Sequence, residues 1–497
     1  MRIAIVGGGL GGLSAAVHLA RVGAQVVLIE KEDMLGGKAG ERWLGAYRFD
    51  TGPSVLTLPA VVESVFRFAG VSLEAYIELV AVDPLTAYFF PDGRKFFIWR
   101  NRERMREEFR AWGSTSLQDW ERFLRYTRRL YENAAPLFLY QPLHEVRYLL
   151  QSRALWRMRN LFLPIDPFRS MYGAIRHYFS DPALIQIAMR YATYNGSDPY
   201  QAPATLNLIF WVENGLGVFY VKGGMYRLVE ALGRLAQELG VEIRSGTAVH
   251  RILHRRGKVI GLETDRGFLP AEVVVSNVDV YTTYEQLLRA PLPKLMRWAD
   301  SSLSGLVFLW GVRAQTCLPH HTVFFSEDYR QEFESLFRVR KPPPEPTIYV
   351  AITSKEDSSH APQGGENWFV LLNMPAWEGE WPARETQRLR EAVLYRLERA
   401  VPGLERAKIE EEAVLTPAYW QAMGSKGGSL YGAASNRVWS AFVRPPNRSR
   451  RFEGLYFVGG STHPGGGIPL VLLSGRHVAR LISDAYKIVP KNVWQIV

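Results

Sequence analysis

The chain opens with a strand, a glycine turn and a helix, which together restrict the fold more than any other feature. Residues 2–6 form a short apolar run, and residues 14–22 have helical periodicity. Between them lies a GxGxxG pattern made by Gly7, Gly9 and Gly12. The first glycine permits a tight turn, the second lets the backbone approach a pyrophosphate, and the third lets the helix pack on the strand. This order predicts a phosphate-binding turn at a helix N-terminus.

A second apolar run at residues 25–29 ends at Glu30. An acidic residue about 20 positions after the glycines accepts hydrogen bonds from a ribose diol. The first thirty residues therefore predict a dinucleotide-binding βαβ unit. Leu10 in the turn and Lys31 beside the acid belong to the same expected site.

Two more glycine turns follow closely and favour FAD over NAD. The first contains Gly37 and Lys38, and the second contains Gly52 and Pro53. Three adjacent turns would make a longer cradle for phosphate and ribityl groups. Each of the two later turns, taken alone, is equally compatible with an ordinary surface turn.

A similar unit stands near the C-terminus. Residues 455–458 predict a short buried strand, residues 459–467 a glycine-rich turn, and residue 470 onward a helix. This unit would bring a second helix N-terminus to the cofactor. Its expected cofactor-binding residues are Gly459, Gly460, Gly467, Ile468 and Pro469, with the last two against the flavin face or the mouth of the pocket.

These motifs resemble the bacterial-type phytoene desaturase family, the FAD-dependent carotenoid desaturases. The resemblance extends through residues 190–209, 217–232, 318–329, 347–375 and 440–469, and so covers essentially the whole chain. It implies a monoamine-oxidase-like flavoprotein fold, FAD as cofactor, and a long polyene or prenyl chain as substrate.

The resemblance also suggests individual contacts. The strand near Val249 is similar to the one whose backbone meets the adenine in this fold. One departure from flavoproteins in general is that Ser461 and Thr462 stand where many place an acid after the C-terminal turn. The contacts that other flavoenzymes make after this turn are therefore a weak guide to the contacts of Ser461 and Thr462.

The expected fold class is α/β, with a Rossmann-type FAD-binding domain, a discontinuous α+β substrate domain and a helical, membrane-contacting region. The FAD-binding domain would comprise residues 1–85, 215–280 and 421–497. The substrate domain would comprise residues 86–214 and 281–420, including an aromatic hairpin at 88–99 and a helix at 385–404.

Bulky apolar residues alternate with arginine in residues 152–179, as in a helix lying in a membrane interface. A solvated amphipathic helix on a domain core is the alternative. The net charge of +11 suits an anionic lipid surface. Nucleic acid is not an expected partner, because no nucleic-acid-binding signature is present.

The remaining composition indicates the compartment. The apolar N-terminal run passes directly into the glycine turn, so it predicts part of the fold rather than a secretion signal. No window reaches the roughly 18 apolar residues of a spanning helix. The single cysteine, Cys317, excludes an internal disulfide and is expected to be buried. We therefore expect a cytoplasmic protein, peripheral on the inner face of the cell membrane.

No metal-ligand cluster, catalytic triad or CxxC motif is present, so the chemistry is expected to come from the flavin. Desaturation removes a hydride and a proton, and conjugation stabilises the developing cation. A strong protein base is therefore not required. Glu213 and His463 are the candidate proton-handling residues, although each also fits a structural role.

The sequence thus predicts an FAD-dependent carotenoid desaturase that is reoxidised by quinone or oxygen. Related alternatives are a 3,4-desaturase or a ketolase or oxygenase acting on a later carotene, and a carotenoid isomerase. A non-enzymatic alternative is a prenyl-chain-binding escort protein of the same fold, which the complete glycine set disfavours.

Overall fold

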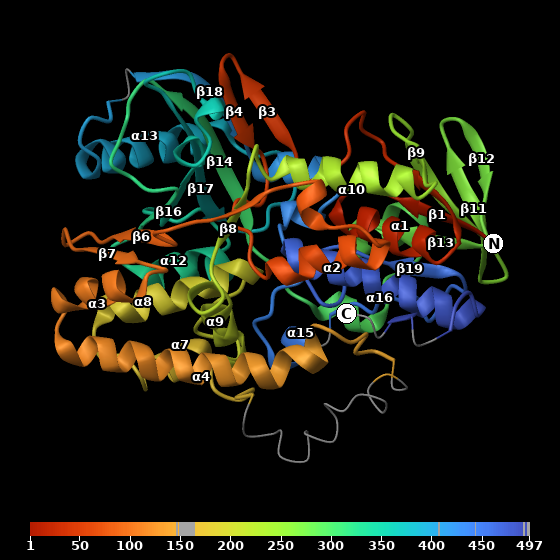
Figure 1. The fold of residues 1–497 in the computed structure, drawn as a ribbon, viewed down its shortest axis with the longest axis horizontal. Helices are drawn as coiled ribbons and strands as arrows, with labels where there is room; N and C mark the ends of the chain where they lie inside the picture. Colours follow the sequence, from red (N-terminus) through yellow and green to blue (C-terminus); the bar gives the residue numbers. More distant parts are fainter. Residues whose placement is uncertain (146–147, 149–164, 406–407, 443, 491–492, 495–497) are drawn as a thin grey trace.

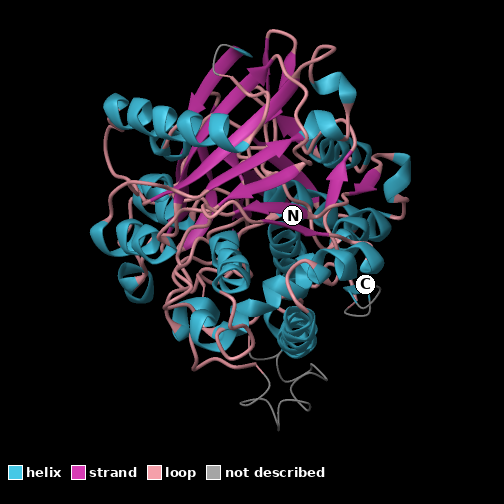
Figure 2. Ribbon diagram, turned by 90° about the vertical axis from the view of Figure 1, so that its left-hand side faces the viewer, coloured by secondary structure: helices cyan, strands magenta, loops and turns pink. Residues whose placement is uncertain are grey.

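Two large β-sheets organise the molecule, with helices covering their outer faces (Figures 1 and 2). The computed structural model describes all residues except 146–147, 149–164, 406–407, 443, 491–492 and 495–497. Much of the 152–179 segment, for which membrane contact is expected, therefore lies outside the described residues.

The first sheet is parallel and has the strand order β19-β13-β1-β2-β9. Its strands are β1 (Arg2–Val6), β2 (Gln25–Ile29), β9 (Glu242–Arg244), β13 (Val273–Ser276) and β19 (Leu455–Phe457). The central strands are almost entirely buried because helices pack on one face of the sheet, whereas the strands of residues 249–270 and residues 280–288 pack on the other. The strands expected at residues 2–6 and 25–29 are confirmed.

One face of this sheet is covered by helices α1 (Leu10–Arg21), α2 (Pro59–Ala69), α10 (Tyr226–Glu238) and α16 (Ile468–Tyr486) (Figure 1). Helices α1 and α16 touch backbone to backbone, since a Cβ at Gly475 would lie 2.6 Å from the amide nitrogen of Ala15. The hydroxyl of Ser14 donates to the carbonyl of Leu472 over 2.7 Å. The first and last motifs of the chain are therefore joined directly.

The second sheet is mixed and has the order β18-β14-β17-β16-β15-β6-β7. Its strands are β6 (Thr86–Phe89), β7 (Lys95–Ile98), β14 (Ser304–Val312), β15 (His321–Phe324), β16 (Ile348–Ile352), β17 (Glu366–Met374) and β18 (Ile409–Leu415). The pairing of β6 with β7 confirms the hairpin expected at 88–99. Helix α13 (Ala383–Ala400) forms a core with this sheet around the buried Trp310 and Trp368.

Smaller elements complete the fold. The sheets are the hairpin β3 (Glu41–Leu44) with β4 (Tyr47–Asp50), the pair β5 (Leu79–Ala81) with β8 (Phe219–Val221), and the trio β10 (Val249–Arg255), β11 (Lys258–Thr264) and β12 (Gly267–Pro270). The short helices outside the helical layer are α11 (Val280–Thr282), α12 (Tyr329–Phe333), α14 (Pro417–Ala422) and α15 (Val438–Phe442).

A helical layer lies below the second sheet in Figure 1. It contains α3 (Arg102–Arg110), α4 (Ser114–Phe138), α7 (Met171–Ile175), α8 (Pro182–Arg190) and α9 (Leu208–Asn214). Edge-to-face aromatic contacts hold the layer together, such as Trp120 against Phe210 at 4.8 Å. Among the described residues, no helix combines the length and the apolar character needed to cross a bilayer.

Three expectations need correction. Helix α1 begins at Leu10, not at residue 14, and α16 begins at Ile468, not at residue 470. Glycine and proline weaken helices on average, but Gly11 and Gly12 lie where close packing requires them and Pro469 occupies the first turn, where its missing N–H costs nothing. Cys317 is exposed, not buried, because it lies in a loop after β14.

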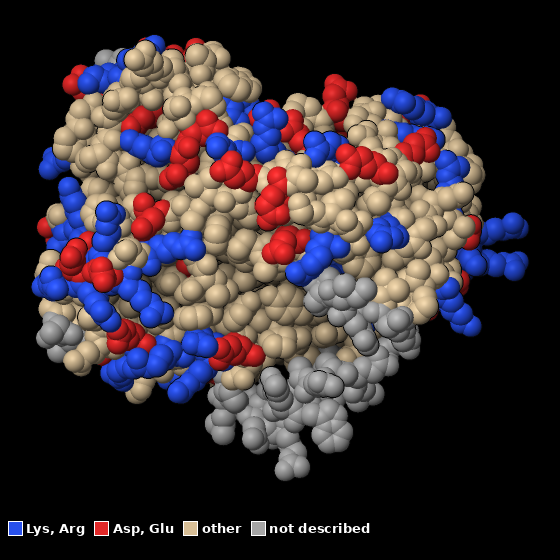
Figure 3. All heavy atoms as spheres, viewed as in Figure 1, with Lys and Arg blue, Asp and Glu red and all other residues tan. Residues whose placement is uncertain are grey.

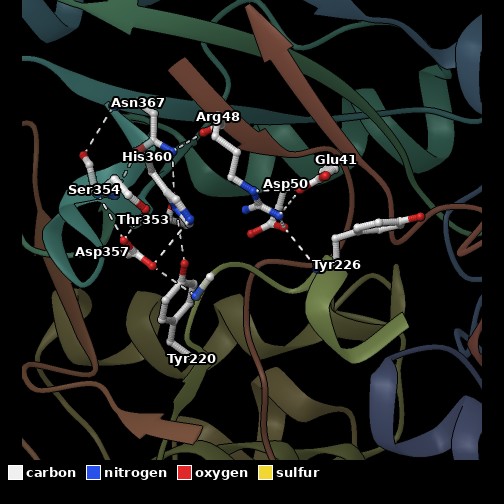
Figure 4. Close-up of polar contacts among 12 residues, drawn as sticks. Glu41, Arg48, Asp50, Tyr220, Tyr226, Thr353, Ser354, Asp357, His360 and Asn367 are labelled. Carbon is white, nitrogen blue, oxygen red and sulfur yellow. Dashed lines mark hydrogen bonds and ion pairs between the residues drawn. The ribbon is translucent and has the colours of Figure 1, made fainter. Parts of the chain in front are cut away.

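Arg48 anchors the region where the two sheets meet (Figure 4). Its guanidinium is 2% exposed and lies 2.8 Å from Asp50 and 3.0 Å from Glu41. It covers the backbone of Gly224, where a Cβ would lie 2.0 Å from Nη1. The side-chain amide of Asn367 in β17 donates to the Arg48 carbonyl over 2.5 Å. One buried ion cluster therefore ties β4 to α10 and to the second sheet.

Replacing Arg48 with glutamine should destabilise the protein strongly, because the two carboxylates would lose their buried counter-charge. Removal of one partner from a buried ion pair typically costs about 3–5 kcal/mol of unfolding free energy. Urea denaturation measures the change. Arg67→Gln is the matched control, since its pair with Glu63 is half exposed and should change stability by no more than about 0.5 kcal/mol. Equal effects at both positions would contradict the assigned role of Arg48.

Candidate cofactor- and substrate-binding site

Three N-terminal glycine turns converge at the carboxyl end of the parallel sheet. The amide of Gly36 donates to the carbonyl of Gly8 over 3.0 Å, which places the second turn against the first. A Cβ at Gly52 would lie 1.8 Å from the carbonyl oxygen of Lys38, so the third turn fits against the second only as glycine. A Cβ at Gly12 would lie 2.2 Å from the Gly7 carbonyl. The turns therefore form one continuous backbone surface.

Asn277, which the sequence analysis missed, joins this surface to the C-terminal turn. It follows β13, the strand between β1 and β19. Its side-chain atoms would lie 2.7 Å from a Cβ at Gly9 and 2.8 Å from one at Gly459. A polar residue directly after a buried strand was the available signal, because carboxyl ends of neighbouring parallel strands share one edge of the sheet.

Glu30 lies at the same edge and is almost fully buried. Its carboxylate accepts from the amide of Gly8 over 2.7 Å and from the amide of Glu32 over 3.1 Å. The acid is thereby held beside the first turn with acceptor capacity left for a ribose. Lys31 donates from Nζ to the carbonyl of Ala422 over 3.1 Å. Val249 lines the cavity on the adjoining segment.

Lys38 is held inside the cleft by backbone acceptors. Its ammonium donates to the carbonyls of Ser429 and Leu430 over 3.2 and 3.1 Å. Burial lowers the pKa of Lys38 to about 8, while Asp279 opposes the shift. Burial likewise raises the pKa of the Asp279 carboxyl, opposed by Lys38. The two charges partly compensate each other at the base of the cleft.

The C-terminal glycine turn closes the cleft from the opposite side. Arg444 donates to the carbonyl of Tyr431 over 2.9 Å and to that of Gly460 over 3.3 Å, and burial lowers its pKa to about 10. His463 lies within the turn and lines the cavity, and its Nε2 is 2.8 Å from the carbonyl oxygen of Gln141. Burial lowers the pKa of His463 to about 3, so the ring is neutral near pH 7.

One cavity of about 1250 Å³ runs along all these turns. Single-ligand pockets typically measure roughly 300–1,000 Å³, so this one has room for more than one bound group. It is lined by Gly7, Gly9, Leu10, Glu30, Lys31, Gly37, Lys38, Gly52, Pro53, Val249, Gly459, Gly460, His463, Gly467, Ile468 and Pro469. Of the expected site residues, only Gly12 and Glu213 do not line it; Gly12 instead packs α1 against the turn.

Beyond the glycine turns the cavity becomes apolar. Its wall there comes from the second sheet and from the helical layer, and includes Val307, Val323, Phe369, Leu371, Ala134, Phe138, Leu208, Ile209, Val212 and Phe442. The strands supply one part of this wall, and α4, α9 and α15 supply the other. A long hydrocarbon chain would match this lining.

Glu213 lies behind the cavity wall in a buried polar cluster. Its carboxylate accepts from the hydroxyls of Tyr191 and Tyr194, and it lies 3.8 Å from the guanidinium of Arg190. Arg190 and Tyr194 do line the cavity, and Arg190 also donates to Tyr88 over 3.0 Å. Glu213 is therefore one layer removed from any ligand. No sequence pattern pointed to these tyrosines, because their partners lie on other elements.

The cleft offers what FAD requires from a protein. The N-termini of α1 and α16 both open onto it through glycines, Gly9 and Gly467, and neither end has a side-chain cap. Such helix ends bind phosphate through free N–H groups and the helix dipole. Within the described residues, no group of three or more His, Cys, Asp or Glu side chains could hold a metal ion.

The model of the flavin containing amine oxidoreductase family matches residues 10–483. A solved oxidoreductase from Methanosarcina mazei has the same fold, with a TM-score of 0.63, 17% identity, and coverage of 96% of this chain and 99% of that one. Because the identity is this low, the similarity supports the architecture alone.

Two curated relatives match almost end to end. The 1-hydroxycarotenoid 3,4-desaturase of Flavobacterium sp. (strain P99-3) is 37% identical over 486 residues, covering 97% of this chain and 98% of the relative. The 4,4'-diapolycopene oxygenase of Methylomonas sp. is 38% identical over 491 residues, with the same two coverages. The chain therefore belongs to the flavin-containing amine oxidoreductase family and, within it, to the bacterial carotenoid desaturases and oxygenases.

Proposed function

We propose that this protein is an FAD-dependent oxidoreductase that desaturates C–C bonds of a long isoprenoid polyene in carotenoid synthesis. The observation that carries the proposal is the single cavity that joins a dinucleotide cradle to a long apolar chamber. An escort protein would need the chamber but not the cradle. The two relatives, whose names state carotenoid desaturation and oxygenation, support the same substrate class.

We assign the cofactor to residues 1–85, 215–280 and 421–497, and the substrate to residues 86–214 and 281–420. Every strand of the parallel sheet comes from the first set and every strand of the mixed sheet from the second, which supports this division. The glycine turns would hold the pyrophosphate and ribityl chain, Glu30 the ribose and Val249 the adenine. Ile468 and Pro469 would lie against the flavin ring.

FAD supplies the oxidant for hydride removal when it is bound. The protein holds the polyene in the apolar chamber, excludes water through residues such as Phe369 and Leu371, and orients one C–C bond toward the glycine turns. Glu213 could exchange a proton with the cavity only through other residues, because the hydroxyls of Tyr191 and Tyr194 donate to its carboxylate oxygens. His463 would remain neutral and fix the C-terminal turn.

We also propose peripheral contact with the inner face of the cell membrane. The apolar end of the cavity is lined by Phe138 and Phe442, which pack in one cluster with Ile165. Phe168, three residues further along, is 80% exposed. Lys and Arg side chains, interspersed with acidic ones, gather over α3 and α4 on the face shown in Figure 3. A bilayer at this end could deliver the polyene and a quinone acceptor, with oxygen as the alternative acceptor.

Expression in hosts that accumulate phytoene or lycopene tests the reaction. We expect new carotenoids with longer conjugation, because desaturation extends the polyene, and absorption spectra with mass spectrometry measure the change. A mass increase by oxygen would assign the oxygenase alternative. Isomers of unchanged mass would assign the isomerase. Unchanged pigment in both hosts, from a protein purified with FAD, would contradict the proposed function.

Gly9→Ala should lower FAD content by about ten-fold or more, equivalent to at least 1.4 kcal/mol of binding free energy. The added methyl would lie 2.7 Å from the Asn277 amide and in the path of the pyrophosphate. Flavin absorbance per protein measures the loss. Gly173→Ala in α7 is the control, since its Cβ would meet only the Ser170 hydroxyl at 3.2 Å. Full flavin content in Gly9→Ala would show that this turn does not hold the cofactor.

Liposome flotation should recover the protein with anionic vesicles more than with neutral ones, and less of it at high salt. Phe168→Ser should weaken recovery, because an apolar ring would no longer enter the interface. Phe268→Ser in β12 is the matched control, an equally apolar exposed ring at 58% exposure on another element. No recovery with either vesicle, or equal effects of the two substitutions, would contradict this membrane contact.

A further inference from the structure

We propose that the proton released by desaturation leaves the cavity through a buried relay, from the hydroxyl of Tyr349 to His321 and onward through His320 to Glu356 near the surface. This inference rests on the proposed function and names the residues that handle its proton. The relay leaves the cavity through the second sheet, and its first member, Tyr349, also lies against the guanidinium of Arg190 at 5.9 Å.

The relay begins at a hydroxyl that lines the cavity. Tyr349 is on β16, and its Oη lies 2.7 Å from the hydroxyl of Ser54. Ser54 directly follows Gly52-Pro53, part of the assigned cofactor cradle, and lines the cavity as well. A polyene bound beside the cradle would therefore lose its proton next to the Tyr349 oxygen on the cavity wall.

The second member lies on the neighbouring strand. His321 on β15 has its Nδ1 2.8 Å from Tyr349 Oη, which is hydrogen-bond distance. The ladder pairs Tyr349 with Val323, so His321 and Tyr349 are diagonal neighbours on one face of the sheet. His321 is only 1% exposed. The geometry is thus fixed by a strand register rather than by a loop.

The link between the two histidines has ring nitrogens without partners. His321 Nε2 and both ring nitrogens of His320 are buried and have no hydrogen-bond partner among the described residues. The two rings lie 4.2 Å apart between centroids, which is direct contact. Each ring therefore has a nitrogen free to take up or release a proton beside the other ring.

The path ends at a carboxylate that reaches solvent. His320 is 2% exposed, whereas the side chain of Glu356 is 25% exposed, and its Oε1 lies 3.8 Å from His320 Nδ1. An ion pair forms across this distance only when His320 carries a proton. Glu356 would therefore attract a proton outward and release it to bulk water.

A hydride with its two electrons leaves one carbon for FAD, and the adjacent carbon loses a proton while its C–H electrons form the new double bond. The Tyr349 oxygen accepts that proton as its own hydroxyl proton passes to His321 Nδ1. His321 releases a proton from Nε2 toward His320, and one proton reaches solvent. The cation formed by hydride loss is acidic enough for a neutral hydroxyl to accept its proton in this concerted way.

Burial keeps both groups of the first link uncharged at rest. Burial, together with nearby His320 and Arg190, lowers the pKa of the His321 imidazole well below its usual value. Burial raises the pKa of Tyr349, so it rests as a neutral hydroxyl. Tyr349 thus keeps its hydroxyl proton and His321 takes up no extra one, so the relay carries no net charge until the substrate loses its proton.

Anaerobic stopped-flow mixing of the FAD-loaded enzyme with phytoene or lycopene in detergent tests the relay. Flavin absorbance reports hydride transfer, and a pH-indicator dye in weak buffer reports proton release. Positioned acid–base groups typically contribute about 10²–10⁴-fold, so Tyr349→Phe and His321→Gln should each slow flavin reduction by at least 100-fold at unchanged FAD content. His320→Gln should delay the dye signal behind the flavin signal.

His18→Gln is the control, a histidine on α1 that is 1% exposed and does not line the cavity. It should leave both signals within about three-fold of the wild type, below the smallest effect expected for an acid–base group. Reduction of Tyr349→Phe at the wild-type rate would overturn the relay while leaving the proposed function intact. Wild-type flavin that neither carotene reduces would instead contradict the proposed function.

Nitrogen NMR of histidine-labelled protein without substrate gives a readout independent of turnover. The hydrogen bond from Tyr349 should shift one imidazole Nδ1 resonance, and Tyr349→Phe should abolish that shift while the protein still binds FAD. This variant only removes a hydroxyl, so it keeps the test decisive if His321→Gln fails to fold. An unchanged histidine spectrum in Tyr349→Phe would overturn the first link of the relay.

Discussion

The close approach of backbone segments around Asn277 is the constraint on which the rest of the structure depends. A Cβ at Gly11 would lie 2.9 Å from the amide nitrogen of Gly459, so the first and last glycine turns of the chain touch directly. Only residues without side chains can pack this closely. Because the two turns also lead into α1 and α16, their contact fixes two helix N-termini on one cleft.

The path of the chain between the two sheets follows from this contact. The chain leaves the parallel sheet after the third glycine turn, builds part of the mixed sheet, returns for α10 and β9 to β13, and leaves again before β19 closes the cleft. Each crossing brings strands of the mixed sheet beside the cofactor cradle. The Arg48 cluster stabilises this arrangement, since separating the sheets would break the hydrogen bond from Asn367 to the Arg48 carbonyl and expose a buried ion cluster to water. The apolar chamber can therefore hold its position relative to the glycine turns.

Local sequence patterns predicted most of the glycine-turn residues that line the cleft. The limits of β1 and β2 were predicted to the residue, because a short apolar run before a glycine turn leaves little choice. Asn277, Tyr349 and His321 escaped notice because their roles depend on strand pairing between residues distant in the chain. His321 pairs across the ladder with residues some thirty positions later, and no periodicity reports such a register. Glu213 was predicted as a candidate site residue, but only the fold reveals the two tyrosine hydroxyls that donate to its carboxylate.

The polar cluster at Arg190 shows how an apolar cavity can tolerate a fixed cation near a reaction that develops positive charge. Four tyrosine rings surround the guanidinium, with centroids 5.2 to 5.9 Å from its carbon, and Glu213 lies 3.8 Å away. The ring faces and the carboxylate both oppose the positive field. With that field neutralised, a polyene losing a hydride would meet little repulsion, and its cation could be stabilised by conjugation alone. A buried carboxylate one layer behind the wall can thus influence the chemistry through the charge that it cancels, without touching the substrate.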